Sequence, residues 1–477
     1  MTMPTQIRFG TDGWRAVIAE DFTFENVRAC AQGVSDYLRE QGLAGRGLIV
    51  GYDTRFGSER FAAAVAEVSA ANGIKTLLCS SAAPTPVVSY NVVARKAGGA
   101  VVITASHNPS EWNGFKYKPD YGGSASPEVV AALEQRIERA QRDGTVKRTP
   151  LNEAVAAKMV ETFDPAPTYL DHISELVDLD AIRQAKLTVV VDSMYGAGAG
   201  YLKRLLRGGK LRVVELHGTR NPLFPGMAQP EPIAPNLAAL ARRVPALKAD
   251  VGLATDGDAD RLGVMDERGV FITQLQTYAL LALYLLEARG QRGALVKSIT
   301  TTSMIWKLGQ RFNVPVFETA VGFKYIGPIM MRENALVGGE ESGGYGYRGH
   351  IPERDGVLSA LYILDLMVKK GMRPSQLITY LYDLVGPHHY DRIDARFPQG
   401  ERQRIIERLK AAEPASFDGL KVERLETTDG FRWLLEGGSW VLVRFSGTEP
   451  LLRIYCETDS PARVKRLLQQ AREMAGV

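Results

Sequence analysis

Short apolar runs and longer stretches with helical spacing follow one another along most of the chain. The runs at residues 47–51, 100–103 and 187–192 are mostly apolar, which predicts buried strands. Ser126 and Pro127 begin a segment whose apolar residues recur every three or four positions, as in a helix that buries one face. Strands that alternate with helices favour sheets covered by helices. The pattern therefore predicts consecutive α/β units.

The last part of the chain has a different pattern. Residues 390–394, 438–443 and 452–455 alternate between polar and apolar side chains, which predicts half-buried antiparallel strands. A helix is expected from Ser460 to Met474. This segment is therefore expected to form an α+β unit.

The composition allows several cores and argues against some classes of protein. With 477 residues, of which 45% are hydrophobic, the chain is long enough for about three to four domains. A formal net charge of +4 suits an anionic substrate, but the charge is too small and too dispersed for a nucleic-acid partner. The longest apolar stretch, around residues 278–286, is expected to be helical and is too short to span a membrane. The first residues lack the basic and apolar parts of a signal peptide.

The cysteines point to a reducing compartment. Cys30, Cys79 and Cys456 lie far apart and form no CxxC pair, so they indicate neither a disulfide framework nor a zinc site. Buried thiols are the expected state. We therefore expect a cytoplasmic protein.

A hydroxyl, an imidazole and an amine occur close together at Ser106, His107 and Lys116. The segment from residue 104 to 116 is rich in Asn, Pro and Gly, which predicts irregular structure. It follows the expected strand at residues 100–103, so Ser106 should lie at the edge of the sheet where open α/β folds build their sites. A Ser-His pair in a loop is more often an ordinary turn with a local hydrogen bond. The segment alone therefore does not define a nucleophile.

Three carboxylates at alternate positions follow another apolar run. Asp256, Asp258 and Asp260 are separated by Gly257 and Ala259, whose small size lets the backbone curl. Several oxygens at short range suit a hard divalent cation, and both calcium and magnesium sites can begin this way. The later Gly and Glu of an EF-hand are missing, and an open coordination position favours Mg²⁺ bound to phosphate oxygen. The alternative is a solvated acidic turn, whose carboxylates would repel one another without a cation.

Two further loops carry groups suited to a sugar phosphate, although each is a weak signal alone. Glu340 and Ser342 are framed by glycines after an apolar run at residues 335–337, and such a loop can press a carboxylate against sugar hydroxyls. A loop after residues 440–443 offers a guanidinium, two hydroxyls and free amides to a phosphate dianion. Its candidate residues are Arg444, Ser446, Gly447 and Thr448.

The order and wide spacing of the four loops resemble the α-D-phosphohexomutase family, which includes phosphoglucomutases and phosphomannomutases. The resemblance extends from Phe9-Gly-Thr-Asp-Gly-Trp-Arg15 to Arg453. It implies a phosphoserine enzyme that moves phosphate between the 1- and 6-positions of a hexose, with Mg²⁺ as cofactor and hexose 1,6-bisphosphate as intermediate and activator. It also implies three consecutive α/β domains with mixed sheets and a C-terminal α+β domain around a central cleft. The expected domains are residues 1–164, 165–269, 270–385 and 386–477.

The resemblance also implies a role for each candidate residue. Ser106 would carry the phosphate and, with the three aspartates, hold the metal ion. Arg15 and Arg261 would add positive charge. A lysine crowded by arginine and metal charge should have its pKa pulled down toward neutrality, which makes Lys116 a candidate base. His107 would either take part in proton transfer or hold the shape of the loop. The expected substrate-binding residues are Lys297, Lys324, Glu340, Ser342, Arg444, Ser446, Gly447 and Thr448.

The substrate is expected to be a small sugar phosphate, acted on by a monomer or homodimer without nucleic acid or membrane. The Glu340-Glu341-Ser342 triplet and Lys324 resemble the loops of glucose-phosphate mutases, which favours glucose over mannose or glucosamine. Two alternatives belong to other classes. The protein could be a phosphatase that uses Ser106 as nucleophile, or a sugar-phosphate binder without catalysis.

Overall fold

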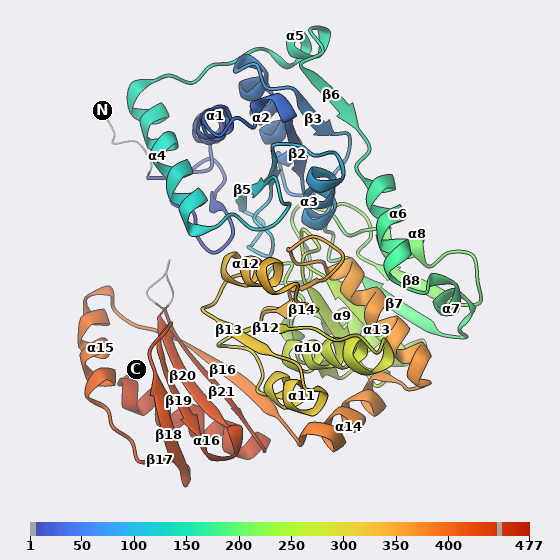
Figure 1. The fold of residues 1–477 in the computed structure, drawn as a ribbon, viewed down its shortest axis with the longest axis vertical. Coiled ribbons are helices and arrows are strands. Elements are labelled where there is room, and N and C mark those ends of the chain that lie inside the picture. Colours follow the sequence, from blue (N-terminus) through green and yellow to red (C-terminus); the bar gives the residue numbers. More distant parts are fainter. Residues whose placement is uncertain (1–5, 446–450) are drawn as a thin grey trace.

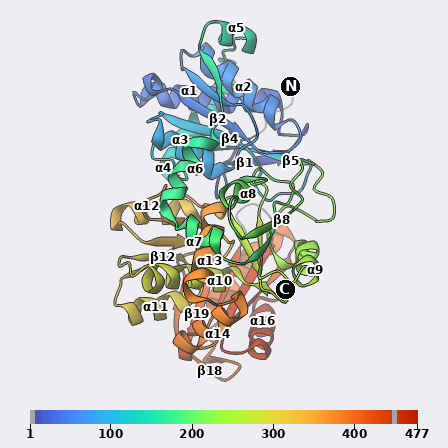
Figure 2. The ribbon, with the colours of Figure 1, turned by 90° about the vertical axis from the view of Figure 1, so that its right-hand side faces the viewer.

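The structure, a computed structural model, describes residues 6–445 and 451–477. Four sheets follow one another in chain order, each with its own helices (Figure 1). In both views the first and last sheets lie toward opposite ends of the molecule, with the other two between them (Figures 1 and 2). The first three sheets are mixed and the fourth is antiparallel. The predicted succession of three α/β units and one α+β unit is confirmed.

The first domain is built on a six-stranded sheet of order β1-β5-β4-β2-β3-β6. Its elements are β1 (Trp14–Val17), α1 (Phe24–Glu40), η1 (Ala44–Arg46), β2 (Leu48–Tyr52), α2 (Ser58–Ala71), β3 (Thr76–Cys79), α3 (Thr85–Ala94), β4 (Gly99–Ile103), β5 (Trp112–Pro119), α4 (Pro127–Asp143), α5 (Leu151–Ala156) and β6 (Val160–Phe163). Leu48 and Val50 of β2 face a core with α1, α2 and α4, whereas Ile49 faces a core with α3. This alternation explains why the central strands are apolar on both faces.

Strand β5 corrects one expectation. The segment from Trp112 to Lys116 is not irregular but pairs antiparallel with β1 and β4, so the loop is confined to residues 104–111. Gly114 permits this, because a Cβ atom there would lie 2.4 Å from the carbonyl oxygen of Thr104 and 2.8 Å from that of Trp14. The glycine thus marks a close approach of strands rather than a turn.

The second domain has a five-stranded sheet of order β11-β10-β9-β7-β8. Its elements are α6 (Ala166–Leu176), α7 (Leu179–Gln184), β7 (Thr188–Asp192), α8 (Tyr201–Leu205), β8 (Arg212–Leu216), η2 (Ala234–Asn236), α9 (Ala238–Ala246), β9 (Val251–Thr255), β10 (Leu262–Met265) and β11 (Phe271–Ile272). Strand β11 pairs with β10, so this sheet extends just beyond the boundary expected at residue 270.

The third domain has a four-stranded sheet of order β13-β12-β14-β15. Its elements are α10 (Gln274–Leu283), the π-helical turn η3 (Tyr284–Ala288), β12 (Leu295–Ser298), α11 (Met304–Phe312), β13 (Val316–Thr319), α12 (Phe323–Glu333), β14 (Val337–Gly339), β15 (Tyr345–Tyr347), α13 (Gly356–Lys370) and α14 (Pro374–Val385). Gly338 and Gly339, expected in a loop, belong to β14. A Cβ atom at Gly339 would lie 2.7 Å from the ring of Tyr278, so the glycine lets α10 pack against the strand.

The fourth domain is an antiparallel sheet of order β16-β21-β20-β19-β18-β17. Its elements are β16 (His389–Arg396), η4 (Gln399–Glu401), α15 (Arg402–Ala411), β17 (Ser416–Phe417), β18 (Leu420–Glu426), β19 (Phe431–Leu435), η5 (Glu436–Gly438), β20 (Trp440–Phe445), β21 (Leu451–Thr458) and α16 (Pro461–Ala475). Ser460 caps α16, as the sequence predicts. The sheet and its two α-helices share one core.

The first three domains share a continuous core, whereas the fourth joins the third through polar contacts and a small separate apolar cluster in which Ile299 meets Trp440 and Leu442. Arg432 of β19 pairs with Glu318 of β13, and the backbone amide of Ser303 donates to Glu457 of β21 at 2.6 Å. All three cysteines are buried and free. No helix in the described part of the chain is long and apolar enough to cross a membrane.

Candidate active site

The nucleophile candidate Ser106 lies just beyond β4, at the carboxyl end of the strand, as predicted. Its backbone has a φ of 52°, a left-handed conformation that costs energy for a residue with a side chain. The backbone amide of Ser106 donates to Oγ1 of Thr104 at 2.8 Å, which helps to hold this turn. Its hydroxyl donates to Oδ2 of Asp256 at 2.9 Å. The first domain thus brings its serine directly to the acidic loop of the second.

The three acidic residues predicted as metal ligands converge after β9. Asp256, Asp258 and Asp260 are fully buried, and each offers a carboxylate oxygen within 4.8 Å of the others. Ala259 between them has a φ of 55°, which provides the expected curl of the backbone. A Cβ atom at Gly257 would lie 2.4 Å from the carbonyl oxygen of Ser106, so the glycine allows the two loops to touch.

The electrostatics of this cluster fit a divalent cation. Burial, together with the charges of Asp260 and Asp258, raises the pKa of Asp256 well above its ordinary value. One oxygen of Asp258 and one of Asp260, both Oδ1, are buried without a hydrogen-bond partner among the described residues. Buried carboxylate oxygens without donors are costly unless a cation satisfies them. The donor set of three oxygens suits a hard metal ion that also binds phosphate.

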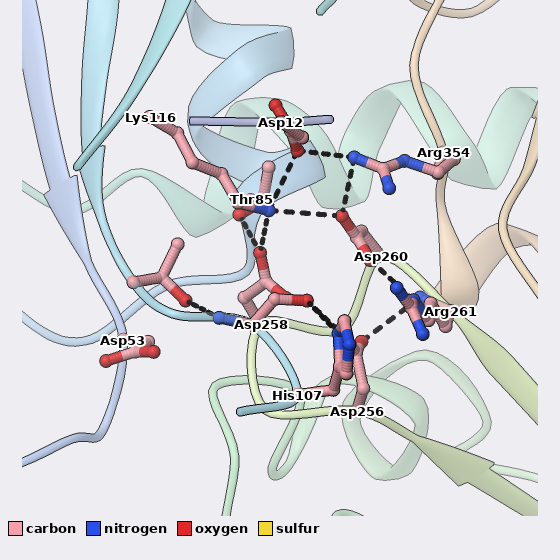
Figure 3. Close-up of polar contacts among 12 residues, drawn as sticks. Asp12, Asp53, Thr85, His107, Lys116, Asp256, Asp258, Asp260, Arg261 and Arg354 are labelled. Atoms are coloured by element: carbon pink, nitrogen blue, oxygen red, sulfur yellow. Dashed lines mark hydrogen bonds and ion pairs between the residues drawn. The ribbon is translucent and has the colours of Figure 1, made fainter. Parts of the chain in front are cut away.

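Lys116 corrects a second expectation, because it is held as a cation. Its Nζ lies 2.8 Å from Asp258, 3.4 Å from Asp260 and 2.9 Å from Asp12 (Figure 3). Burial disfavours the charge, but the three carboxylates outweigh it and raise the pKa of Lys116 above its ordinary value. The predicted lowering of this pKa is therefore wrong. The carboxylates that surround this amine come from other segments of the chain, so the residues next to Lys116 give no sign of them.

His107 is instead kept neutral. Its enclosed position, together with the positive charges of Arg261, Arg15 and Lys116, holds the pKa of His107 well below its ordinary value. The Nδ1 atom lies 3.3 Å from the hydroxyl oxygen of Ser106. A neutral imidazole at this distance can accept a proton near the nucleophile.

Both predicted arginines flank the same loops. Arg15 donates to the side chain of Asn108 at 2.7 Å, two residues beyond the serine. Arg261 pairs with Glu231 at 2.9 Å, and its backbone amide donates to Asp256 at 3.1 Å. The structure thus places both side chains beside the serine and the acidic cluster.

Two charged residues that sequence reasoning missed connect the domains. Arg354 contacts Asp12 at 2.5 Å and Asp260 at 3.0 Å (Figure 3). It also lies 3.7 Å from Glu340 and thereby links the first three domains. Asp12 lies within the segment 9–15 that marks the start of the family resemblance. Arg354 precedes α13 and gave no recognisable signal, because its partners are remote in sequence.

The sugar-loop candidates differ in their surroundings. Glu340 is buried, and burial raises its pKa to about 7 although the charge of Arg354 opposes the shift. Ser342 and Lys324 are partly exposed, and Nζ of Lys324 lies 3.5 Å from the carbonyl oxygen of Gly10. Lys297 is buried and pairs with Glu318 at 2.6 Å, so the structure gives its amine a protein partner. A substrate role for Lys297 stays a prediction.

The predicted phosphate clamp is described only in part. Arg444 lies on β20, and its Nε donates to Asp429 at 2.9 Å. Burial and the carboxylate of Glu341 raise the pKa of Tyr455 on the neighbouring strand β21. Ser446, Gly447 and Thr448 lie outside the described residues.

Comparisons with known proteins show which family has these four domains. Family models for α/β/α domains I, II and III and for the C-terminal domain of phosphoglucomutase/phosphomannomutase match residues 6–143, 167–269, 275–385 and 395–474. The chain belongs to this family of phosphohexomutases, which are isomerases that move phosphate within one sugar molecule.

Individual relatives have different names. The chain is 33% identical to a phosphoglucomutase/phosphomannomutase of Thermococcus kodakarensis, over 97% of this chain and 96% of that protein. It is 31% identical to a probable phosphoglucosamine mutase of Thermococcus gammatolerans, over 98% and 97% of the two chains. A crystal structure from Thermus thermophilus, whose name assigns it to the phosphomannomutases, is 35% identical, covers both chains fully and has a TM-score of 0.86. These names agree on the family and differ in the sugar.

Proposed function

We propose that the protein interconverts glucose 1-phosphate and glucose 6-phosphate through a phosphorylated Ser106 and glucose 1,6-bisphosphate. The observation that carries this proposal is the contact of 2.9 Å between the Ser106 hydroxyl and Asp256. Asp256 belongs to a cluster of three buried aspartates, and the other two, Asp258 and Asp260, each have one oxygen without a hydrogen-bond partner among the described residues. A serine next to a strong cation site, rather than next to a hydrolytic triad, suits phosphoryl transfer.

The side chains around the serine supply the other requirements of the reaction. Mg²⁺, held by Ser106 and the three aspartates, would neutralise charge on the transferring phosphoryl group. Arg15 and Arg261 would add fixed positive charge at the same place. Because His107 is neutral and Lys116 is charged, we assign to His107 the uptake of the proton that the attacking hydroxyl loses. Lys116 would instead orient the carboxylates of the acidic loop.

The preference for glucose rests on the sugar loop. Glu340, Glu341 and Ser342 would accept from and donate to ring hydroxyls, and Lys324 on α12 would approach a phosphate at the far end. Arg444 and the loop that follows it would hold the phosphate that does not react. Mannose and glucosamine phosphates are the alternative substrates, as the names of the relatives also suggest. A cytoplasmic location and a monomeric or homodimeric state stay predictions.

One assay separates the mutase from the two other classes. Purified enzyme is given glucose 1-phosphate and Mg²⁺ with and without glucose 1,6-bisphosphate, while glucose 6-phosphate and free phosphate are both measured. A mutase forms glucose 6-phosphate, is activated by the bisphosphate and releases little phosphate. Release of phosphate as the main product would indicate a phosphatase, and no product would indicate a binder. Faster turnover of mannose or glucosamine 1-phosphate would overturn glucose but retain the mutase.

The matched variants are Ser106→Ala and Ser110→Ala. Both serines lie in the loop before β5, but only Ser106 touches the acidic cluster, whereas Ser110 lies near Glu111. We expect Ser106→Ala to lose turnover and to keep the melting temperature within a few degrees, and Ser110→Ala to behave like the wild type. Turnover by pure Ser106→Ala enzyme would remove Ser106 from the nucleophile's position.

A further inference from the structure

A buried arginine outside the acidic cluster organises the loop that carries the nucleophile. Arg55 lies between β2 and α2, and its side chain is 0% exposed. One terminal nitrogen donates to the carbonyl oxygens of Ser106 at 2.8 Å and Asn108 at 2.5 Å. The other donates to those of Pro109 at 2.7 Å and Trp112 at 3.0 Å. A single guanidinium therefore donates to three carbonyl groups of the loop and to that of Trp112, the first residue of β5.

The loop needs this arginine because it has little regular structure of its own. A segment without helix or strand leaves its carbonyl groups without ladder partners, and buried carbonyl groups must find donors. The planar guanidinium has five N–H groups in a fixed fork, which no other side chain can replace. Its grip on the Ser106 carbonyl fixes the peptide group directly after a residue in a left-handed conformation. The direction of the Ser106 side chain follows from that backbone.

The guanidinium is itself held in place by a carboxylate. Oδ2 of Asp53 lies 3.2 Å from Nε of Arg55, while Oδ1 accepts from the Arg55 amide at 2.9 Å and from Ser58 at 2.8 Å. Asp53 is also fully buried, so the charges of the pair largely cancel. The arginine therefore acts on the loop through geometry rather than through an added charge beside the phosphate.

The second domain grips the segment that carries this arginine. Arg220 donates to the carbonyl oxygens of Thr54 at 2.9 Å and Arg55 at 3.0 Å, and pairs with Glu59 at 2.8 Å. The hydroxyl of Thr54 donates to the carbonyl oxygen of Tyr195 at 2.8 Å. Two arginines therefore connect the second domain to the nucleophile. Arg220 of the second domain binds the backbone of Arg55, and the side chain of Arg55 binds the backbone of Ser106.

We propose that Arg55 is a positioning residue for phosphoryl transfer, which orients the Ser106 hydroxyl toward the acidic cluster. In this proposal Arg220 makes that orientation depend on how the second domain docks against the first. The inference rests on the proposed role of Ser106 as phosphate carrier. Arg55 donates to backbone carbonyl groups around the serine and lies outside the acidic cluster. Its loss should therefore slow transfer without weakening substrate binding.

The test compares Arg55→Lys with Arg46→Lys. Arg46 also donates to a backbone carbonyl, that of Lys96 at 2.9 Å, but it lies on η1 outside the nucleophile loop. Each enzyme is phosphorylated with glucose 1,6-bisphosphate, its phosphoserine content is determined by mass spectrometry, and transfer to glucose 1-phosphate is followed in a single turnover. Per phosphorylated molecule, we expect Arg55→Lys to transfer at least about tenfold more slowly at a KM within about twofold of the wild type. Arg46→Lys should match the wild type.

A purely structural role gives a different result. Arg55→Lys would then melt at a lower temperature but transfer phosphate at the wild-type rate per phosphorylated molecule, and this outcome overturns the inference. If Arg55→Lys does not fold, the test uses Arg220→Met instead. Arg220 is partly exposed, and its loss removes only the hydrogen bonds that hold the backbone of Thr54 and Arg55 and the ion pair with Glu59. A several-fold lower kcat at unchanged KM supports the coupling, and a wild-type kcat overturns it. A wild-type enzyme that never becomes phosphorylated overturns the proposed function itself, and with it this inference.

Discussion

Glu340→Gln should stabilise the protein in a pH-dependent manner, because Glu340 is a buried acid whose pKa is raised by folding. The carboxylate is 3% exposed, and burial raises its pKa to about 7 in the folded protein. The unfolded chain has an ordinary pKa of about 4.3–4.5 for this group. Between these values the folded state binds more protons than the unfolded state, so the free energy of unfolding falls as the pH rises. Below the unfolded pKa there is no such loss.

The size of the effect follows from the width of this pH window. At about 1.4 kcal/mol per pH unit, ionisation of Glu340 costs under about 1 kcal/mol near pH 5 and about 3 kcal/mol near pH 8. Glutamine does not titrate and has no such cost. The stability of Glu340→Gln relative to the wild type should therefore rise by about 2.5 kcal/mol between these pH values. With an unfolding entropy of about 2 cal/mol/K per residue, this corresponds to a difference of about 2–3 °C in melting temperature for a chain of 477 residues.

The assay is thermal unfolding of both proteins in steps between about pH 5 and pH 8, in chelator so that the metal site does not add its own pH dependence. Ser342→Ala is the matched control, because it changes the same loop without changing a titratable group. Its melting temperature relative to the wild type should be constant across this range. A difference between Glu340→Gln and wild type that does not grow with pH would refute the raised pKa.

Three further predictions test the site. Asp258→Asn should abolish tight binding of Mg²⁺ in calorimetry and lower kcat by orders of magnitude. Asp171→Asn, on the exposed side of α6, should change neither Mg²⁺ binding nor kcat. Undiminished activity in excess chelator would contradict a metal role. Lys116→Met should destabilise the metal-free protein by about 3–5 kcal/mol, because it removes the cation that three buried carboxylates share, of which Asp12 and Asp260 keep Arg354 as a partner. Mg²⁺ should raise the melting temperature of this variant more than that of the wild type. An unchanged melting temperature would mean that the carboxylates find other partners. Arg444→Ala should lower kcat/KM by a factor equivalent to about 1.5–3 kcal/mol, mainly by raising KM, since the clamp would hold a phosphate that does not react. An unchanged KM would place the clamp elsewhere.

The alternation of strands and helices, the different pattern of the last domain and the four candidate loops could be predicted from the sequence. The apolar run at residues 100–103 encodes a strand buried on both faces, and Ser460 encodes a helix cap, because each signal depends on neighbours in the chain. The alternating acids of residues 256–260 likewise indicate a cation site from local spacing alone. The strand at residues 112–119 was missed because Gly114, a local signal for a turn, serves a contact with two other strands.

The charge states of the site residues, and the contacts that hold their loops in place, depend on the tertiary structure. The charge of Lys116 depends on Asp12, Asp258 and Asp260, which lie on two other segments, and no local pattern shows that they surround the amine. Arg354 and Arg55 also have partners that are remote in sequence, so their roles appear only when the domains are packed. A pKa and a fixed backbone depend on distances in space, and those distances are set by how the sheets dock. The order of residues sets which groups are available, and the packing of the domains sets which of them meet and in what charge state.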